Sequence, residues 1–138
     1  MEKYRKTMKN ELKRILVVDD EANITILLQT VLERTREYVV RTENASVRAL
    51  KAATEFKPDL ILLDVDMPGM GGGELASRLY DNPMFKTVPV VFLTGAVTKA
   101  EVSARNGRIG GLPFLAKPVA LAEVLGCVRK HLEAEVVQ

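Results

Sequence analysis

The chain has 138 residues, of which 47% are hydrophobic, and this length suits one domain with a substantial core but not two ordinary ones. Its formal net charge of +2 provides no strongly basic surface, so we expect no direct binding of nucleic acid. Apolar runs are far shorter than a membrane-spanning helix, no signal core follows the N-terminal charges, and the single cysteine excludes an intramolecular disulfide, so a cytoplasmic protein is expected.

The chain begins with a basic segment, followed by the first strand and helix. Residues 1–12 carry several lysine and arginine side chains and predict a partly disordered leader before a domain that spans residues 13–138. The β-branched run 15–18 then predicts a strand that is buried on both faces. The apolar residues that follow have the spacing of one helical face; they are Ile24, Leu27, Leu28, Val31 and Leu32.

A second strand and a second helix are predicted next. Residues 38–41 have the composition of a strand, and Asn44 is the expected cap of the following helix. The residues of this helix that are expected to face inward are Val47, Ala49, Leu50, Ala53 and Phe56. Pro58 then breaks the chain before the next strand.

Three further units of strand and helix complete the pattern. The apolar runs 60–63, 88–93 and 114–116 predict strands, and a glycine-rich loop after the first of them leads into a short helix. Thr98 and Glu101 have the spacing of a capping box that starts the next helix. The last helix is expected to face inward with Leu121, Val124, Leu125, Val128 and Leu132. Five such units predict an α/β fold of three layers, with a parallel sheet between helices.

Polar residues follow the predicted strands and define a candidate site. Asp19 and Asp20 follow the first strand, Asp64 the third, Thr94 the fourth and Lys117 the fifth. In a parallel sheet the carboxyl ends of the strands share one edge, where ligands bind, so these side chains are expected to converge. Two carboxylates about 4 Å apart repel by roughly 4 kcal/mol at an effective dielectric of about 20, so three of them need cations nearby. A divalent metal ion and Lys117 would supply this charge.

The residue types at this site favour phosphoryl chemistry. Oxygen ligands with an open face suit Mg²⁺, for which Mn²⁺ could substitute, and a carboxylate nucleophile can form an aspartyl phosphate. Lys117 and Thr94 would hold oxygens of the phosphoryl group. Each residue alone has a structural alternative: a helix cap for an acid, a turn hydroxyl for Thr94 and a solvated loop charge for Lys117. Their joint occurrence at the strand ends favours the functional interpretation.

These segments resemble the receiver domain of two-component response regulators, of the chemotaxis-regulator type. The resemblance covers roughly residues 13–133. It rests on Ile15-Leu-Val-Val-Asp-Asp-Glu21, Leu60-Ile-Leu-Leu-Asp-Val-Asp-Met-Pro-Gly69, Val90-Val-Phe-Leu-Thr-Gly95 and Phe114-Leu-Ala-Lys-Pro118. It implies a doubly wound (βα)5 flavodoxin-like fold, in which the parallel five-stranded sheet has the order 2-1-3-4-5.

The resemblance also implies a role for each site residue. These are Asp64 as phosphoacceptor, Asp19, Asp20, Asp64 and the backbone carbonyl of Asp66 as metal ligands, Thr94 and Lys117 as contacts of the phosphoryl group, Phe114 as the switch aromatic, and Pro118 as the residue after a cis peptide bond. Such a domain is a signalling switch that only phosphorylates itself and slowly loses the phosphoryl group. It is not an enzyme that turns over a substrate.

The resemblance further implies partners. A sensor histidine kinase or a phosphotransfer protein would donate the phosphoryl group. Residues 99–131, which contain the fourth helix, the fifth strand and the fifth helix, would then control a partner protein or a fused effector domain, and could mediate a homodimer. Phosphorylation would bias a two-state equilibrium of this surface.

Two positions and two alternatives bear on this hypothesis. Asp66 adds an acid at the mouth of the site and Ala96 is small, so both are expected to affect the lifetime of the phosphoryl group. One alternative is a receiver-like interaction module that is never phosphorylated. Another is a phosphatase of the haloacid dehalogenase type, which also has two aspartates at the spacing of Asp64 and Asp66. The short chain, without a substrate-selecting insertion, disfavours the phosphatase.

Overall fold

The computed structural model describes residues 12–105, 107–109 and 111–136. Apart from Leu12, the predicted leader lies outside the described residues. The strands are β1 (Lys13–Val18), β2 (Tyr38–Glu43), β3 (Leu60–Asp64), β4 (Val90–Thr94), β5 (Arg108–Ile109) and β6 (Leu112–Ala116). The α-helices are α2 (Ala22–Arg34), α3 (Ala49–Phe56), α4 (Gly72–Tyr80), α5 (Lys99–Ala104) and α6 (Leu121–Val136), and short 3-10 helices are η1 (Ser46–Arg48) and η2 (Pro83–Phe85).

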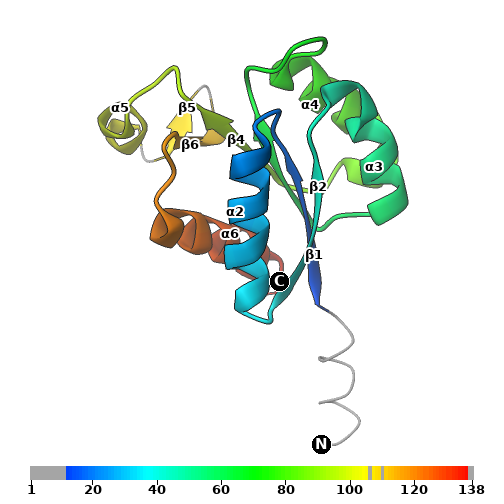
Figure 1. Cartoon of the computed structure of the whole chain (residues 1–138), viewed down its shortest axis with the longest axis horizontal. Coiled ribbons are helices and arrows are strands. Elements are labelled where there is room, and N and C mark those ends of the chain that lie inside the picture. The colour runs from blue at the N-terminus through cyan, green and yellow to red at the C-terminus, as the bar shows by residue number, and fades with distance from the viewer. Residues whose placement is uncertain (1–11, 106, 110, 137–138) are drawn as a thin grey trace, which may run out of the picture.

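The strands form one sheet in the order β2-β1-β3-β4-β6-β5 (Figure 1). All pairings from β2 to β6 are parallel, which confirms the predicted order 2-1-3-4-5 of the parallel strands. In the middle of the sheet, Leu62 of β3 pairs with Val17 of β1 and Val91 of β4. The connections are therefore crossovers that bring the carboxyl ends of the parallel strands to the same edge.

The sheet has one strand that the sequence did not predict. β5 is antiparallel to β6, where Arg108 pairs with Pro113 and Ile109 with Leu112. Two residues are too few to show a periodic pattern, and the pairing depends on a tight return of the chain. Gly107 directly precedes β5 and Gly111 directly precedes β6, with φ values of 78° and 83°, which glycine adopts without strain.

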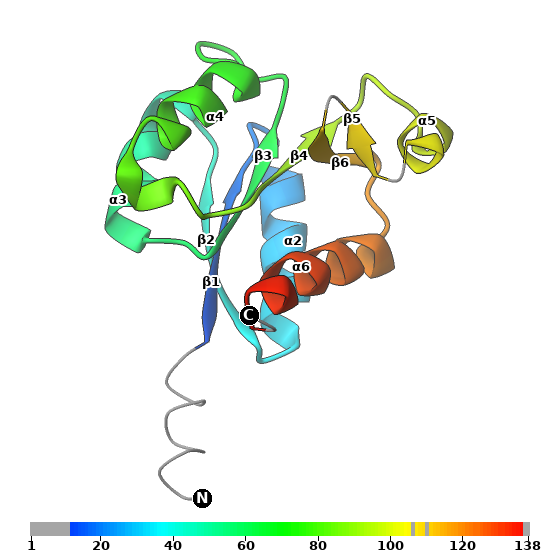
Figure 2. The ribbon, with the colours of Figure 1, turned by 180° about the vertical axis from the view of Figure 1, so that it is seen from behind.

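Helices cover both faces of the sheet, as Figure 1 and the opposite view in Figure 2 show. α2 and α6 pack on the face that contains Ile15 and Val17 of β1, and α3 and α4 pack on the face that contains Leu16 and Val18. All four β1 side chains are at most 1% exposed. Burial on both faces explains why the strand sequences are apolar at every position instead of alternating, and it confirms the three-layer fold.

The structure corrects several local predictions. Val47 was expected to face inward, but its exposed fraction is 67% because it lies in η1, before the regular turns of α3 begin. Asn44 does not cap that helix, since its side chain bonds elsewhere. Leu27 and Leu121 were also expected inward and are 45% and 40% exposed, while Leu28 and its apolar neighbours on α6 fill the core.

The predicted start of α5 is confirmed by its hydrogen bonds. The Glu101 backbone N–H donates to Thr98 Oγ1 over 3.0 Å, and the Thr98 backbone N–H donates to Glu101 Oε1 over 2.8 Å. This reciprocal pair is a capping box, which satisfies two backbone donors that the first turn leaves without partners. Across the described part of the chain, the helices lack the length and apolarity needed to cross a membrane.

Candidate phosphorylation site

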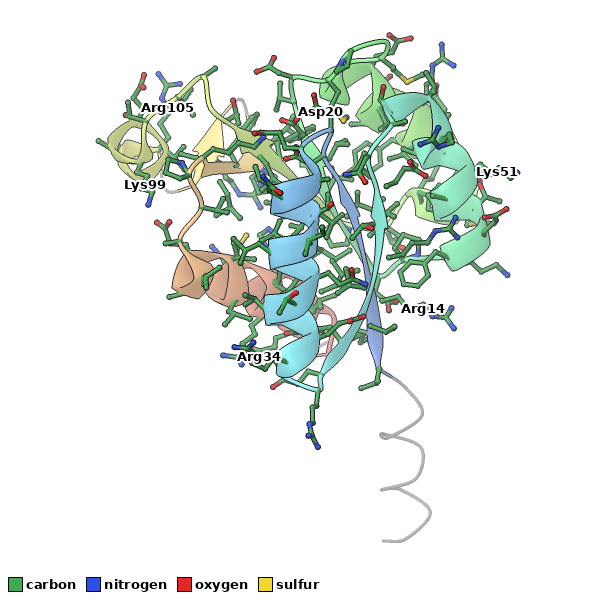
Figure 3. All side chains as sticks on the ribbon, viewed as in Figure 1. Arg14, Asp20, Arg34, Lys51, Lys99 and Arg105 are labelled. Carbon is green, nitrogen blue, oxygen red and sulfur yellow. The ribbon has the colours of Figure 1, made fainter. Side chains whose placement is uncertain are left out.

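The predicted polar residues lie at one edge of the sheet, beyond the carboxyl ends of the parallel strands. Asp64 is the last residue of β3 and pairs with Leu93, the neighbour of Thr94 in β4. Asp20 follows β1 and lies above the N-terminal end of α2 in Figure 3, whereas Arg34 lies at the opposite end of that helix. The topology therefore gathers residues from the carboxyl ends of four strands, β1, β3, β4 and β6, because these strands run in parallel.

Three carboxylates form the centre of the site. One carboxylate oxygen each of Asp19, Asp20 and Asp64 lies within 4.8 Å of the others. Asp19 is fully buried and Asp64 is 3% exposed, while Asp20 is exposed. Asp19 Oδ1 accepts a hydrogen bond of 2.9 Å from the Glu21 backbone N–H, but the buried Oδ2 accepts none from the described residues. Such a buried oxygen needs a cation, and an oxygen-only cluster with one open side fits a hard divalent metal ion.

Lys117 supplies positive charge to this cluster. Its Nζ lies 2.9 Å from Asp19 Oδ2, 3.2 Å from Glu21 Oε1 and 3.3 Å from Asp64 Oδ1. The contact with Asp19 is an ion pair without the angles of a hydrogen bond, which is why that oxygen still lacks a donor. The Lys117 side chain is 15% exposed, so its contacts are screened less than those of a surface pair. The peptide bond between Lys117 and Pro118 is cis.

The environment shifts the pKa of both partners. Burial, and then the negative charge of Asp19, raises the pKa of Asp64 to about 6, although Lys117 pulls it down. Burial alone would lower the pKa of Lys117, but the contact with Asp19 and the further contacts with Glu21 and Asp64 raise it above its ordinary value. At neutral pH the site therefore combines an ionised Asp64 with a firmly protonated Lys117. Perturbed pKa values of this kind, with identifiable charged partners, are typical of functional sites.

An open cavity of about 290 Å³ lies over the acidic cluster. Its lining residues are Asp20, Glu21, Asp64, Asp66, Gly95 and Lys117. Asp66 is exposed at this cavity, and its backbone N–H donates a 3.3 Å hydrogen bond to Asp64 Oδ1. The cavity therefore gives a small anion access to the Asp64 carboxylate beside the Lys117 ammonium ion.

Thr94 is placed at the end of β4 and is 3% exposed. It does not line the cavity; instead, its Oγ1 accepts a 3.0 Å hydrogen bond from the Ala96 backbone N–H. The hydroxyl therefore has to leave this backbone contact if it is to reach a group bound to Asp64.

Phe114 lies in β6, away from the acidic cluster, and packs against the core on the α3 and α4 face of the sheet. Its ring stacks on that of Phe92 in β4, with centroids 5.0 Å apart and an interplanar angle of 27°. A stacked pair of this kind contributes about 0.5–1.5 kcal/mol beyond its buried area. Phe114 is also among the residues that line a cavity of about 360 Å³ between β6 and α6. The residue thus has a defined packing partner and lies next to open space.

The site also depends on residues whose roles the sequence did not indicate. Asn44 Nδ2 donates to the Asp19 carbonyl oxygen over 2.8 Å, which ties the end of β2 to the end of β1. Ser46 Oγ donates to the Pro68 carbonyl over 3.0 Å and accepts from the Met70 backbone N–H over 3.1 Å, so it fixes the loop after Asp64. These contacts join positions far apart in the chain, and no local pattern in the sequence predicts them.

A model of the response regulator receiver domain matches residues 15–129. The chain belongs to this family. Receiver domains are the signalling switches of two-component systems, which agrees with the acidic edge of the sheet described above and confirms the family that the sequence motifs indicated.

Similar proteins include chains of similar length and much longer ones. The chain is 33% identical over 125 residues to sporulation initiation phosphotransferase F of Bacillus subtilis, covering 91% of this chain and 96% of that protein. It is 42% identical over 113 residues to the response regulator PleD of Caulobacter vibrioides, where the match covers 77% of this chain but only 23% of PleD. The receiver domain therefore occurs both nearly alone and as a minor part of a longer protein.

Solved structures of similar shape agree with this assignment. The chemotaxis protein CheY4 of Vibrio cholerae matches with a TM-score of 0.75 and 26% identity, covering 88% of this chain and 99% of that one. A putative response regulator from Chloroflexus aurantiacus matches with a TM-score of 0.73 and 30% identity, covering 88% and 98%. The fold of the described residues is thus that of CheY-like receiver domains.

Proposed function

We propose that Asp64 accepts a phosphoryl group in a reaction that depends on Mg²⁺, and that this modification switches the surface formed by α5, β6 and α6. The observation that carries the proposal is the position of Lys117 Nζ, 3.3 Å from Asp64 Oδ1, beside the three-carboxylate cluster. A nucleophilic carboxylate, a fixed cation and a ligand set for a divalent ion are the parts that phosphoryl transfer to aspartate needs. A cytoplasmic location fits such a role.

Asp19, Asp20 and Asp64, with the backbone carbonyl of Asp66, would hold the metal ion. The three side chains fit a hard divalent cation because they offer only oxygen atoms, and because one buried Asp19 oxygen has no hydrogen-bond donor among the described residues. A bound Mg²⁺, or Mn²⁺ in its place, supplies charge that offsets the negative phosphoryl oxygens.

The chain's own residues carry the transfer. A carboxylate oxygen of Asp64 attacks the phosphorus of a phosphohistidine, and an O–P bond forms as the P–N bond breaks and its electron pair returns to the imidazole nitrogen. Lys117 stays protonated and binds a phosphoryl oxygen, and the Thr94 hydroxyl binds another after it leaves the Ala96 backbone. Later, water attacks the phosphorus, and the O–P bond breaks to give inorganic phosphate and the Asp64 carboxylate.

The movement of Thr94 offers a route from the site to the output surface. Thr94 pairs with Ala116 in the register of β4 and β6, two residues beyond Phe114. A change at the Thr94 hydroxyl would alter the space available to Phe114, whose ring stacks on Phe92 and which is among the residues that line the cavity at α6. A partner protein, a fused effector domain or a second copy of the chain would recognise the result on α5, β6 and α6.

A sensor histidine kinase or a phosphotransfer protein would be the donor in the cell. The relatives that carry this domain as a small part of a longer chain support an effector as the recipient of the signal. From composition we further propose that this domain binds neither nucleic acid nor a membrane, because its charge is nearly balanced and its apolar runs are short.

Phosphoramidate labelling tests the proposal directly. With Mg²⁺, the unaltered chain is expected to gain one phosphoryl group, detected by intact-mass measurement, and Asp64→Asn to gain none because its amide is not a nucleophile. Beryllofluoride with Mg²⁺ should shift the amide NMR signals of Thr94 and Phe114 in the unaltered chain only. A chain that takes no label and shows no shifts is a receiver-like module without phosphorylation, and one that releases phosphate from many monoesters is a phosphatase.

A further inference from the structure

We infer that Glu21 is a positioning residue of the phosphorylation site, which holds the Lys117 ammonium ion in the resting state and competes with the phosphoryl group for it. The inference rests on the proposed function, because it concerns the same lysine. Glu21 Oε1 lies 3.2 Å from Lys117 Nζ and lines the cavity over Asp64. The contact also has the geometry of a hydrogen bond, unlike that between Lys117 and Asp19.

The backbone position of Glu21 makes this contact informative. Glu21 is the N-cap residue of α2, with φ of −88° and ψ of 105°, but its side chain forms no capping hydrogen bond. Short side chains such as Asp, Asn, Ser and Thr are preferred there because they reach the free backbone N–H groups of the first turn. The longer glutamate side chain instead reaches a lysine 96 positions away in the chain. The Glu21 side chain thus contacts Lys117 of the site and does not cap α2.

Glu21 differs from the other two partners of Lys117 in what phosphorylation does to them. Asp64 becomes an acyl phosphate, and Asp19 belongs to the cluster that would hold the metal ion, so both change their bonding during the reaction. Glu21 takes part in neither step. Among the ion-pair partners of Lys117 in the described residues, it is therefore the one that neither accepts the phosphoryl group nor belongs to the metal cluster, so its attraction for Lys117 persists when a phosphoryl oxygen needs the same ammonium ion.

The expected effect of removing this competition is modest and has a definite sign. The Glu21 side chain is 61% exposed, so solvent screens its charge. Exposed ion pairs contribute at most about 1 kcal/mol, which corresponds to about a fivefold change in a dissociation constant. Glu21→Gln is therefore expected to bind a phosphoryl analogue about twofold to fivefold more tightly than the unaltered chain does.

The test is a titration with beryllofluoride at a fixed, saturating Mg²⁺ concentration, followed through the amide NMR signals of the site. The affinity for Mg²⁺ alone is measured separately for each variant, so that a change in metal binding can be distinguished from a change in beryllofluoride binding. Glu37→Gln is the matched control. Glu37 is also a half-exposed acid, 53% exposed and 3.7 Å from the cation of Arg129, but it precedes β2 at the opposite edge of the sheet.

A second variant separates the contact with Lys117 from the mere presence of charge. Glu21→Asp keeps the charge but is one methylene shorter, and aspartate favours the capping bond. If the contact matters, Glu21→Asp tightens beryllofluoride binding as Glu21→Gln does, while Glu37→Gln matches the unaltered chain. Unchanged affinity in Glu21→Gln, or a tightening in Glu21→Gln that Glu21→Asp does not share, would overturn the inference. Failure of the unaltered chain to bind beryllofluoride would instead refute the proposed function itself.

Discussion

Two adjacent glycines at the start of α4 provide a sharp test of the structure around Asp64. A Cβ atom added at Gly72 would overlap the Asp64 carbonyl oxygen and lie 2.9 Å from Val65 Cα. A Cβ atom added at Gly73 would meet nothing within 4 Å. Gly72→Ala and Gly73→Ala therefore make the same chemical change at consecutive positions in the first turn of α4, with opposite steric results.

The magnitude follows from the atoms involved. Both obstacles at Gly72 are backbone, so no side-chain rotation relieves the overlap, and α4 has to move away from the end of β3. This movement stretches the 2.9 Å hydrogen bond from the Gly72 N–H to the Val65 carbonyl. Overpacking costs about 1–3 kcal/mol and a weakened hydrogen bond about 1 kcal/mol, against a helix-propensity gain of about 1 kcal/mol. We expect Gly72→Ala to lose about 2 kcal/mol of unfolding free energy and Gly73→Ala to gain up to about 1 kcal/mol.

Urea unfolding followed by far-UV circular dichroism measures both changes. The midpoint is expected to fall for Gly72→Ala and to rise for Gly73→Ala, with unchanged slopes. Because the displaced carbonyl belongs to Asp64, the folded Gly72→Ala protein should also bind beryllofluoride with Mg²⁺ more weakly than Gly73→Ala does. Equal midpoints for the two variants would show that α4 does not approach Asp64 as closely as the structure places it.

Three further predictions concern the site and the single cysteine. Without divalent metal, Asp64→Asn should raise the unfolding free energy at pH 7 by roughly 2 kcal/mol, because folding raises the pKa of Asp64 from 3.8 to about 6 and ionisation of Asp64 therefore disfavours the folded state. This gain should vanish as the pH falls from 6 to below 4. Parallel pH profiles of the unfolding free energy for the variant and the unaltered chain would contradict the prediction. Asp66→Asn removes a negative charge that repels the phosphoryl group at the cavity, and the longer side chain of Ala96→Glu should shield the phosphoryl group from water. Each variant should slow dephosphorylation about twofold to tenfold in a radiolabel-decay assay. Unchanged rates in both would rule out a role for these positions. Burial raises the pKa of Cys127 to about 11. At pH 8 its thiol should therefore react with a thiol reagent about a hundredfold more slowly in the folded protein than in the chain unfolded by urea. Equal rates in the two states would refute the burial of Cys127.

The order of elements was predictable because each carries a local signal. The run Leu60-Ile-Leu-Leu63 is apolar at every position, which indicates a strand covered on both faces, and all four side chains are fully buried. The capping box of Thr98 and Glu101 likewise depends on residues three positions apart. Exposure of single helix positions was less predictable: Val47 and Leu27 are apolar but lie outside the core, because the neighbouring elements decide which part of a helix is covered.

The sequence by itself determined which groups stand at the ends of the parallel strands. Alternation of strand and helix requires parallel pairing, and parallel pairing brings Asp19, Asp64 and Lys117 to one edge. Only the tertiary structure decided how these groups contact one another: that Glu21 leaves its capping role to hold Lys117, and that Gly72 but not Gly73 touches the backbone of Asp64. Such contacts join residues distant in the chain, so they depend on the packing of whole elements and leave no periodic trace in the sequence.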